Sequence, residues 1–145
     1  MKTFARFISM LVFAGGSCIA AQADHHIFLK ANLILGTNKE QKDKMEALPE
    51  IKDKLSKVFK WKYYYRLNRK KIELKEKETK PVQLSRSASI MVTNIKKNKK
   101  ISVSLYSDGR MLVQKTQALK AGKHMVLAGH TESDSAWFIV LTRPL

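Results

Sequence analysis

The chain has 145 residues, with 28 Lys and Arg against 12 Asp and Glu, and only three Pro and six Gly. This length and composition are typical of one small folded domain, and they exclude a repeat array or a disordered tail. A net charge of +16 favours solubility and anionic partners but does not specify a fold.

The first 23 residues have the three zones of a secretory signal peptide. Lys2 and Arg6 form a basic start, residues 7–14 are apolar, and small residues end at Ala21-Gln22-Ala23. The apolar zone is shorter than the roughly 20 residues that a membrane-spanning helix needs, and no later segment approaches that length. We therefore expect cleavage after Ala23, export to the periplasm or the extracellular space, and no transmembrane segment in the mature chain.

Two alternatives remain open at this end of the chain. An uncleaved leader would anchor the protein. Lipidation of Cys18 would attach it to a membrane, although a lipidation site normally has a large aliphatic residue where this chain has Gly15. Cleavage after Ala23 removes the only cysteine and leaves 122 residues with a net charge of +14. Such a domain has no disulfide or thiolate metal site and is large enough for an unaided hydrophobic core.

Hydrophobic periodicity predicts a strand, a helix and a second strand in the first part of the mature chain. Residues 27–35 alternate apolar and polar side chains, which is the pattern of a half-buried strand. Pro49 and Glu50 suit a first helical turn, and four apolar residues follow on one face: Ile51, Leu55, Val58 and Phe59. From Trp61 the period returns to two, and aromatic residues favour a strand.

Short strands are predicted for the rest of the chain, in residues 71–75, 82–84, 88–94, 101–106, 111–116, 124–128 and 136–142. Ser107-Asp108-Gly109-Arg110 is typical of a hairpin turn, and the lysine-rich run 96–100 suggests another. The predicted fold is mainly β: an antiparallel β-sandwich, immunoglobulin-like or a partly open barrel, with one α-helix. Residues 24–145 form one domain, in which 24–69 are a strand-helix-strand addition and 70–145 the sandwich strands.

The run 60–71 interleaves aromatic and basic residues. On a regular strand, Trp61, Tyr63, Tyr65 and Leu67 share one face, and Lys62, Tyr64, Arg66 and Lys70 share the other. The simpler interpretation is a core face and a solvated face. The alternative is an anion-binding surface, since exposed aromatics stack on bases or sugar rings beside cations that neutralise phosphate or carboxylate groups. Tyr64 distinguishes the two interpretations, because the first leaves a large aromatic side chain on the solvated face unexplained. The predicted polyanion-binding residues are Lys62, Tyr64, Arg66, Arg69, Lys70 and Lys71.

A metal site is a second hypothesis, and it depends on the position of cleavage. A new N-terminus Asp24-His25-His26 would combine a free amine, backbone amides and a third-position imidazole. Square-planar nitrogen ligands of this kind suit copper(II) or nickel(II). The alternative is a polar lead-in to the first strand. A weak site at His130, Glu132 and Asp134 is better explained as a solvated loop, and no other cofactor is predicted.

Catalysis has little support from sequence motifs. No nucleophile-elbow pattern and no phosphate-binding glycine loop are present. The runs Val58-Phe59-Lys60-Trp61, Leu127-Ala128-Gly129 and Ala136-Trp137-Phe138-Ile139-Val140-Leu141 resemble those of uncharacterised small exported bacterial proteins with a predicted β-rich domain. This resemblance implies export and a single β domain, and it implies no activity.

These observations predict an exported, non-enzymatic binding protein of the bacterial cell envelope, associated with an anionic polymer or surface. Its charge and the interleaved aromatic residues favour this function. Two alternatives stay open. One is copper(II) or nickel(II) binding by Asp24-His25-His26, and the other is an envelope protein partner that pairs with an exposed strand edge.

Overall fold

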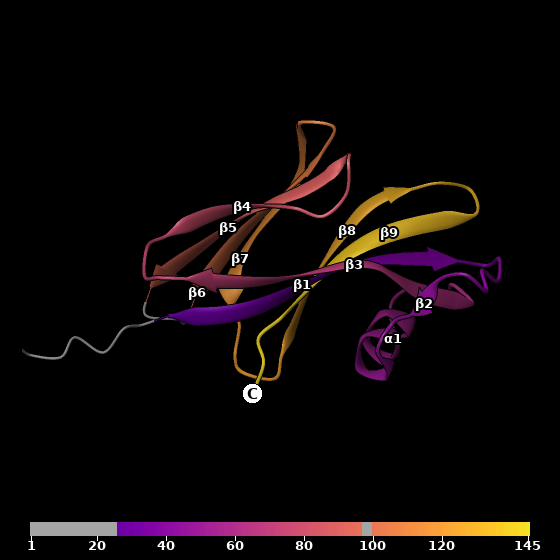
Figure 1. Cartoon of the computed structure of the whole chain (residues 1–145), viewed down its shortest axis with the longest axis horizontal. Coiled ribbons are helices and arrows are strands. Elements are labelled where there is room, and N and C mark those ends of the chain that lie inside the picture. Colours follow the sequence, from indigo (N-terminus) through magenta and orange to yellow (C-terminus); the bar gives the residue numbers. More distant parts are fainter. Residues whose placement is uncertain (1–25, 97–99) are drawn as a thin grey trace, which may run out of the picture.

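Two antiparallel sheets and one short helix form the part of the chain that the computed structural model describes, residues 26–96 and 100–145. The elements are β1 (Ile27–Thr37), β2 (Met45–Glu46), α1 (Pro49–Ser56), β3 (Tyr63–Leu74), β4 (Thr79–Gln83), β5 (Ala88–Lys96), β6 (Lys100–Ser107), β7 (Arg110–Ala118), β8 (His124–Thr131) and β9 (Ser135–Thr142). One sheet has the order β2-β3-β1-β9-β8, and the other has the order β4-β5-β6-β7. The predicted antiparallel β-sandwich with one α-helix is confirmed, and neither sheet closes into a barrel (Figure 1).

The main core lies between the two sheets. Alternate residues of β1 (Ile27, Leu29, Ala31 and Leu33) are buried there, as the period-two pattern predicts. The four-stranded sheet contributes β-branched and leucine side chains, namely Ile90, Val92, Ile101, Val103 and Leu105. Each large apolar side chain buried in this way contributes about 1.5–3 kcal/mol. This core joins the N-terminal and C-terminal halves of the chain.

Helix α1 covers the other face of the five-stranded sheet and builds a smaller core. Ile51 and Leu55 are buried against Ile34 and Phe138 of the sheet. Pro49 occupies the first turn and Glu50 follows it, as the sequence predicts. The helix ends at Ser56, so Val58 is exposed, whereas Phe59 still packs against this core. In Figure 1 the helix and the C-terminus lie on the same side of the five-stranded sheet.

The predicted Ser107–Arg110 turn is confirmed. Asp108 and Gly109 both have positive φ, 49° and 79°, which is the conformation that a two-residue hairpin needs. Strand β5 ends at Lys96 and β6 begins at Lys100, so the predicted lysine-rich turn between them falls on residues outside the described ones. The loop between the strands predicted at 124–128 and 136–142 is short, because β8 continues to Thr131 and β9 begins at Ser135.

The predicted division into an N-terminal addition (24–69) and sandwich strands (70–145) is not what the structure shows, because the N-terminal strands belong to the sandwich itself. Strands β1 and β3 are central members of the five-stranded sheet, between β2 on one side and β9 on the other. The strand expected from Trp61 and the strand expected at 71–75 are one continuous strand of 12 residues. Pairing of β3 along the whole of β1 explains this, because the partner for both halves is the same strand.

A bulge in β3 changes which side chains face α1. The register with β1 shifts between Leu33, opposite Asn68, and Ile34, opposite Arg66, so Leu67 is the extra residue. A one-residue insertion exchanges the two faces of a strand beyond it. Regular alternation, on which the sequence-based assignment of faces rests, therefore fails at Leu67.

Candidate anion-binding site

The bulge divides the predicted polyanion-binding residues between the two faces of the sheet. Arg69 pairs with Asn32 and Arg66 with Ile34, which puts both arginines on the face that α1 partly covers. Lys71 joins them there. Lys70 pairs with Ala31 of the main core and faces the opposite way, which corrects the predicted grouping of Lys70 with Arg66. Lys62 is exposed and precedes the strand.

Tyr64 is not a ligand-stacking residue, and its assignment to the polyanion-binding set is wrong. Its side chain is only 2% exposed. Its hydroxyl donates to the carbonyl oxygen of Phe59 (3.0 Å), and its ring lies 6.5 Å from that of Phe138. Burial raises the pKa of Tyr64, so the phenol stays neutral. Helix α1 and the segment after it supply the apolar cover that a strand pattern alone does not show.

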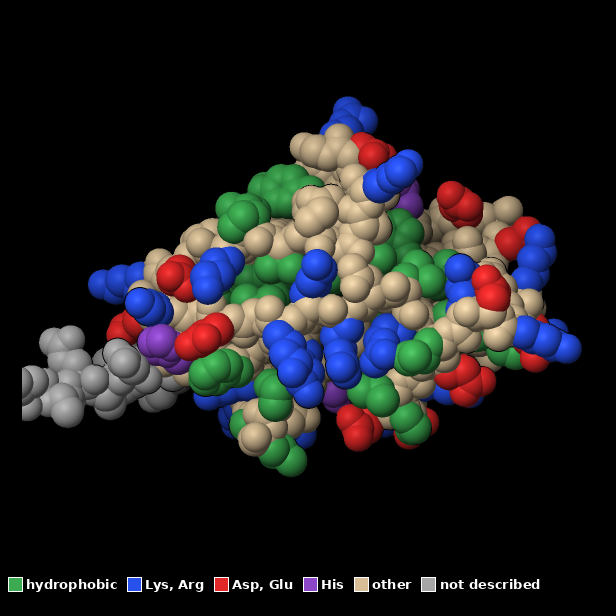
Figure 2. Space-filling view, viewed as in Figure 1, with side chains coloured by type: hydrophobic (Ala, Val, Ile, Leu, Met, Phe, Trp, Pro, Cys, Tyr) green, Lys and Arg blue, Asp and Glu red, His purple; other side chains and the backbone are tan. Residues whose placement is uncertain are grey.

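Three of the predicted cations lie on one sheet face together with Lys30, which was not in the predicted set. We call these four residues the basic face: Lys30, Arg66, Arg69 and Lys71. Lys30 of β1 stands directly opposite Lys71 of β3. In the described part of the chain, no carboxylate lies within ion-pair distance of any of the four. Figure 2 shows basic side chains gathered in a row over β3. Unpaired neighbouring cations repel each other, and an anionic ligand would relieve that repulsion.

Phe28 supplies the exposed aromatic side chain that Tyr64 does not. It is 57% exposed and pairs with Glu73 on the same sheet face as Lys30 and Lys71. The sequence held a signal for this residue, since Phe28 occupies the polar phase of the β1 pattern together with Lys30 and Asn32. A large aromatic in that phase has no core to enter.

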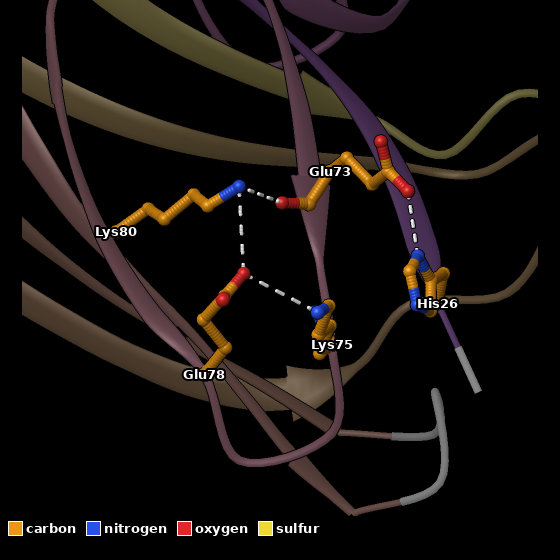
Figure 3. Close-up of polar contacts among 5 residues, drawn as sticks. All are labelled: His26, Glu73, Lys75, Glu78 and Lys80. Atoms are coloured by element: carbon orange, nitrogen blue, oxygen red, sulfur yellow. Dashed lines mark hydrogen bonds and ion pairs between the residues drawn. The ribbon is translucent and has the colours of Figure 1, made fainter. Parts of the chain in front are cut away.

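The basic face ends at a cluster that neutralises its own charges (Figure 3). His26 Nδ1 lies 2.5 Å from Glu73 Oε1. Lys80 Nζ donates to the Glu73 carbonyl oxygen (2.7 Å) and lies 3.4 Å from Glu78 Oε1. The backbone N–H of Lys75 donates to Glu78 (3.3 Å), and this bond and the nearby lysines lower the pKa of that carboxyl. Ligand binding is therefore expected on the Lys71 side of Glu73.

A groove of about 360 Å³ opens beside the basic face, between α1 and the C-terminal tail. Its floor comes from four neighbouring strands, with Arg69, Lys30, Asn32, Thr142 and His124 in it. Its walls are the start of α1, with Leu48, Glu50 and Ile51, and the end of the chain, with Arg143, Pro144 and Leu145.

Asn32 is the least expected residue of this groove. Its side chain is 2% exposed, and its Oδ1 has no hydrogen-bond partner in the structure. A buried polar atom without a partner costs about 1–3 kcal/mol. Asn32 belongs to the polar phase of the β1 pattern, which predicts a solvated side chain, and it is buried because α1 and the tail lie over this part of the sheet.

His124 gives the groove a pH-dependent charge. Its Nδ1 lies 2.7 Å from Thr142 Oγ1. Burial lowers its pKa below 6.5, Lys54 and Lys123 lower it further, and Glu50 opposes them. The unfolded chain therefore takes up a proton at His124 more readily than the folded protein does. Stability should fall as the pH drops below about 6.5.

We expect the urea midpoint to decrease between pH 7 and pH 5, and to decrease less in His124→Gln, whose amide keeps a partner for Thr142. Glu78 does not affect this comparison, because its pKa is lowered and its titration therefore changes stability only below about pH 4.5. Parallel pH profiles for the two proteins would contradict the assignment to His124.

Of the three residues predicted to bind copper(II) or nickel(II), only His26 belongs to the described part of the chain. Asp24 and His25 lie outside the described residues, and one ring nitrogen of His26 already contacts Glu73. Within residues 26–96 and 100–145, no three His, Cys, Asp or Glu side chains are grouped closely enough to hold a metal ion. Asp134 Oδ2 lies 3.6 Å from Lys39 Nζ, and both side chains are exposed, which agrees with the interpretation of Asp134 as a surface loop residue.

Comparisons of the chain with protein-family models, with curated proteins and with solved structures give no match. None of the helices in the described residues is both long enough and apolar enough to cross a membrane.

Proposed function

We propose that this is an exported, non-enzymatic binding protein of the bacterial cell envelope, which holds an anionic polymer or surface on its basic face. The observation that carries the proposal is the placement of Arg66, Arg69 and Lys71 on one face by the β3 bulge, with Lys30 beside them. The described structure gives none of the four a carboxylate partner. Phe28 supports it as an exposed aromatic next to these cations.

Electrostatic binding of this kind has a salt signature. Each cation that neutralises a ligand charge releases counterions, so the logarithm of the binding constant falls linearly with the logarithm of the salt concentration. For a duplex DNA probe, four contacts predict a slope of about −3.6. A heparin-type glycan should show the same trend.

Lys70 and Lys71 provide a matched test, because they are adjacent, both exposed and on opposite faces of β3. Lys71→Glu should weaken binding to immobilised heparin about tenfold, since a carboxylate then faces the ligand. Lys70→Glu changes the net charge equally and should alter the affinity less than about twofold. The measurement is surface plasmon resonance at several salt concentrations. Equal losses in both variants, or salt-insensitive binding, would contradict the proposal.

A second candidate is pairing with a strand of another protein. Strand β7 forms an edge of the four-stranded sheet and exposes Met111 and Leu112. The opposite edge, β4, carries Pro81, a residue that disfavours strand addition. Strand addition at β7 predicts a salt-insensitive protein complex that Leu112→Lys, a lysine at an exposed edge position, weakens. The glycan-binding proposal predicts no loss of heparin affinity in this variant.

A further inference from the structure

We infer that the groove beside the basic face is a subsite for one acidic sugar residue, a hydroxylated ring bearing a carboxylate. This inference rests on the proposed function, since it names the unit of the anionic polymer that the protein recognises. The groove volume of about 360 Å³ is near the lower end of ligand sites, which suits one ring rather than a longer segment.

Asn32 provides the first argument. Its Oδ1 is an acceptor without a partner, its side chain is almost completely buried, and it lies in the groove floor instead of in the dry core between the sheets. A ligand hydroxyl is the natural donor for such an oxygen. The groove is therefore built to hydrogen-bond a neutral polar group as well as to attract an anion.

The charges around Asn32 provide the second argument. Arg69 stands directly across from Asn32 on β3, and Lys30 precedes it by two residues on the same face. Both offer donors to a carboxylate, and the planar guanidinium suits bidentate binding. Glu50 lies at the opposite wall and favours a hydroxyl donor there, because a second anionic group would be repelled. This pattern of cations on one side and acceptors elsewhere matches a sugar acid better than a dense phosphate chain.

The walls of the groove provide the third argument. Leu48 and Ile51 from the start of α1 face the groove together with Pro144 from the tail. A pyranose ring has an apolar face of C–H groups that packs against side chains of this type. Lys30 and Arg69 belong to both the groove and the basic face, so a polymer lying along β3 would place one of its residues in the groove.

The test compares three ligands by isothermal titration calorimetry: a glucuronate-containing oligosaccharide, its carboxyl-reduced neutral form, and polyphosphate. The variant is Asn32→Leu, of similar volume, which removes the unpartnered oxygen and is expected to leave the folded state at least as stable as in the wild type. We expect this variant to weaken oligosaccharide binding about tenfold and to leave polyphosphate binding unchanged. The neutral form should bind the wild type at least about tenfold more weakly than the acidic form.

Each outcome decides between the two proposals. Unchanged oligosaccharide affinity in Asn32→Leu overturns the subsite, and the proposed function stands if Lys71→Glu still weakens binding. If sugar binding depends on Asn32 but is unchanged by salt and by Lys71→Glu, the subsite is supported and polymer binding along β3 is overturned. Free glucuronate, added as a competitor of the acidic oligosaccharide, identifies the source of the ligand. Full competition indicates a free sugar acid, and weak competition indicates a residue within a polymer. If circular dichroism shows that Asn32→Leu does not fold, Asn32→Asp is the second variant. Its carboxylate should repel the acidic oligosaccharide and weaken its binding, and an unchanged affinity would overturn the subsite.

Discussion

Replacing Phe138 by alanine is expected to lower the free energy of unfolding by about 3–5 kcal/mol, because the change leaves a large cavity. Phe138 is 1% exposed and lies in the smaller core under α1. Its ring is 4.5 Å from that of Phe59 and 6.5 Å from that of Tyr64. Urea titration followed by tryptophan fluorescence measures the loss.

Phe28→Ala is the matched control for this prediction. It removes the same side chain from the same sheet, but Phe28 is mostly exposed and lies outside both cores. Its cost should stay within about 0.5 kcal/mol. Similar losses for Phe28→Ala and Phe138→Ala would mean that α1 does not cover the sheet in the described way.

The second large effect is expected at Gly36, where side chains of the smaller core under α1 closely approach the backbone of β1. A Cβ at this position would lie 2.6 Å from Trp61 Cδ1 and 3.0 Å from Phe138 Cε2. Gly36→Val should therefore cost about 2–3 kcal/mol, even though valine favours strands. The measurement is again the free energy of unfolding in urea.

A double-mutant cycle identifies the cause of this loss. If the valine clashes with the indole, Gly36→Val should cost much less in a Trp61→Ala background, with a coupling energy above about 1 kcal/mol. Additive costs would show that Trp61 does not lie over Gly36. A stabilising effect of Gly36→Val would contradict the close approach altogether.

Local signals in the sequence were sufficient for much of the fold. The alternation of β1, the proline at the start of α1 and the Asp108-Gly109 turn each depend on a few neighbouring residues, and the structure agrees with all three. The position of β1 and β3 in the middle of a sheet could not be read in this way. It depends on pairing between β1 and β9, which are about a hundred residues apart.

The candidate site was only partly predictable for the same reason. Residues 60–71 were identified as a basic segment, and three of its cations do share one face. The bulge at Leu67 arises from the register with β1 and has no signature in β3 itself, so Lys70 was assigned to the wrong face. Tyr64 is buried by residues of α1 and of the segment that follows it, whose docking position no periodicity reveals.

The most direct measurement of the proposed role of the basic face is an NMR titration of the protein with a short heparin-type oligosaccharide. Side-chain N–H signals distinguish the two faces of the five-stranded sheet. The proposal predicts shifts of the Arg66 and Arg69 Nε–H signals that disappear at high salt, with no shift of the Trp137 indole N–H on the opposite face. Shifts at Trp137 without shifts at Arg66 and Arg69 would contradict it.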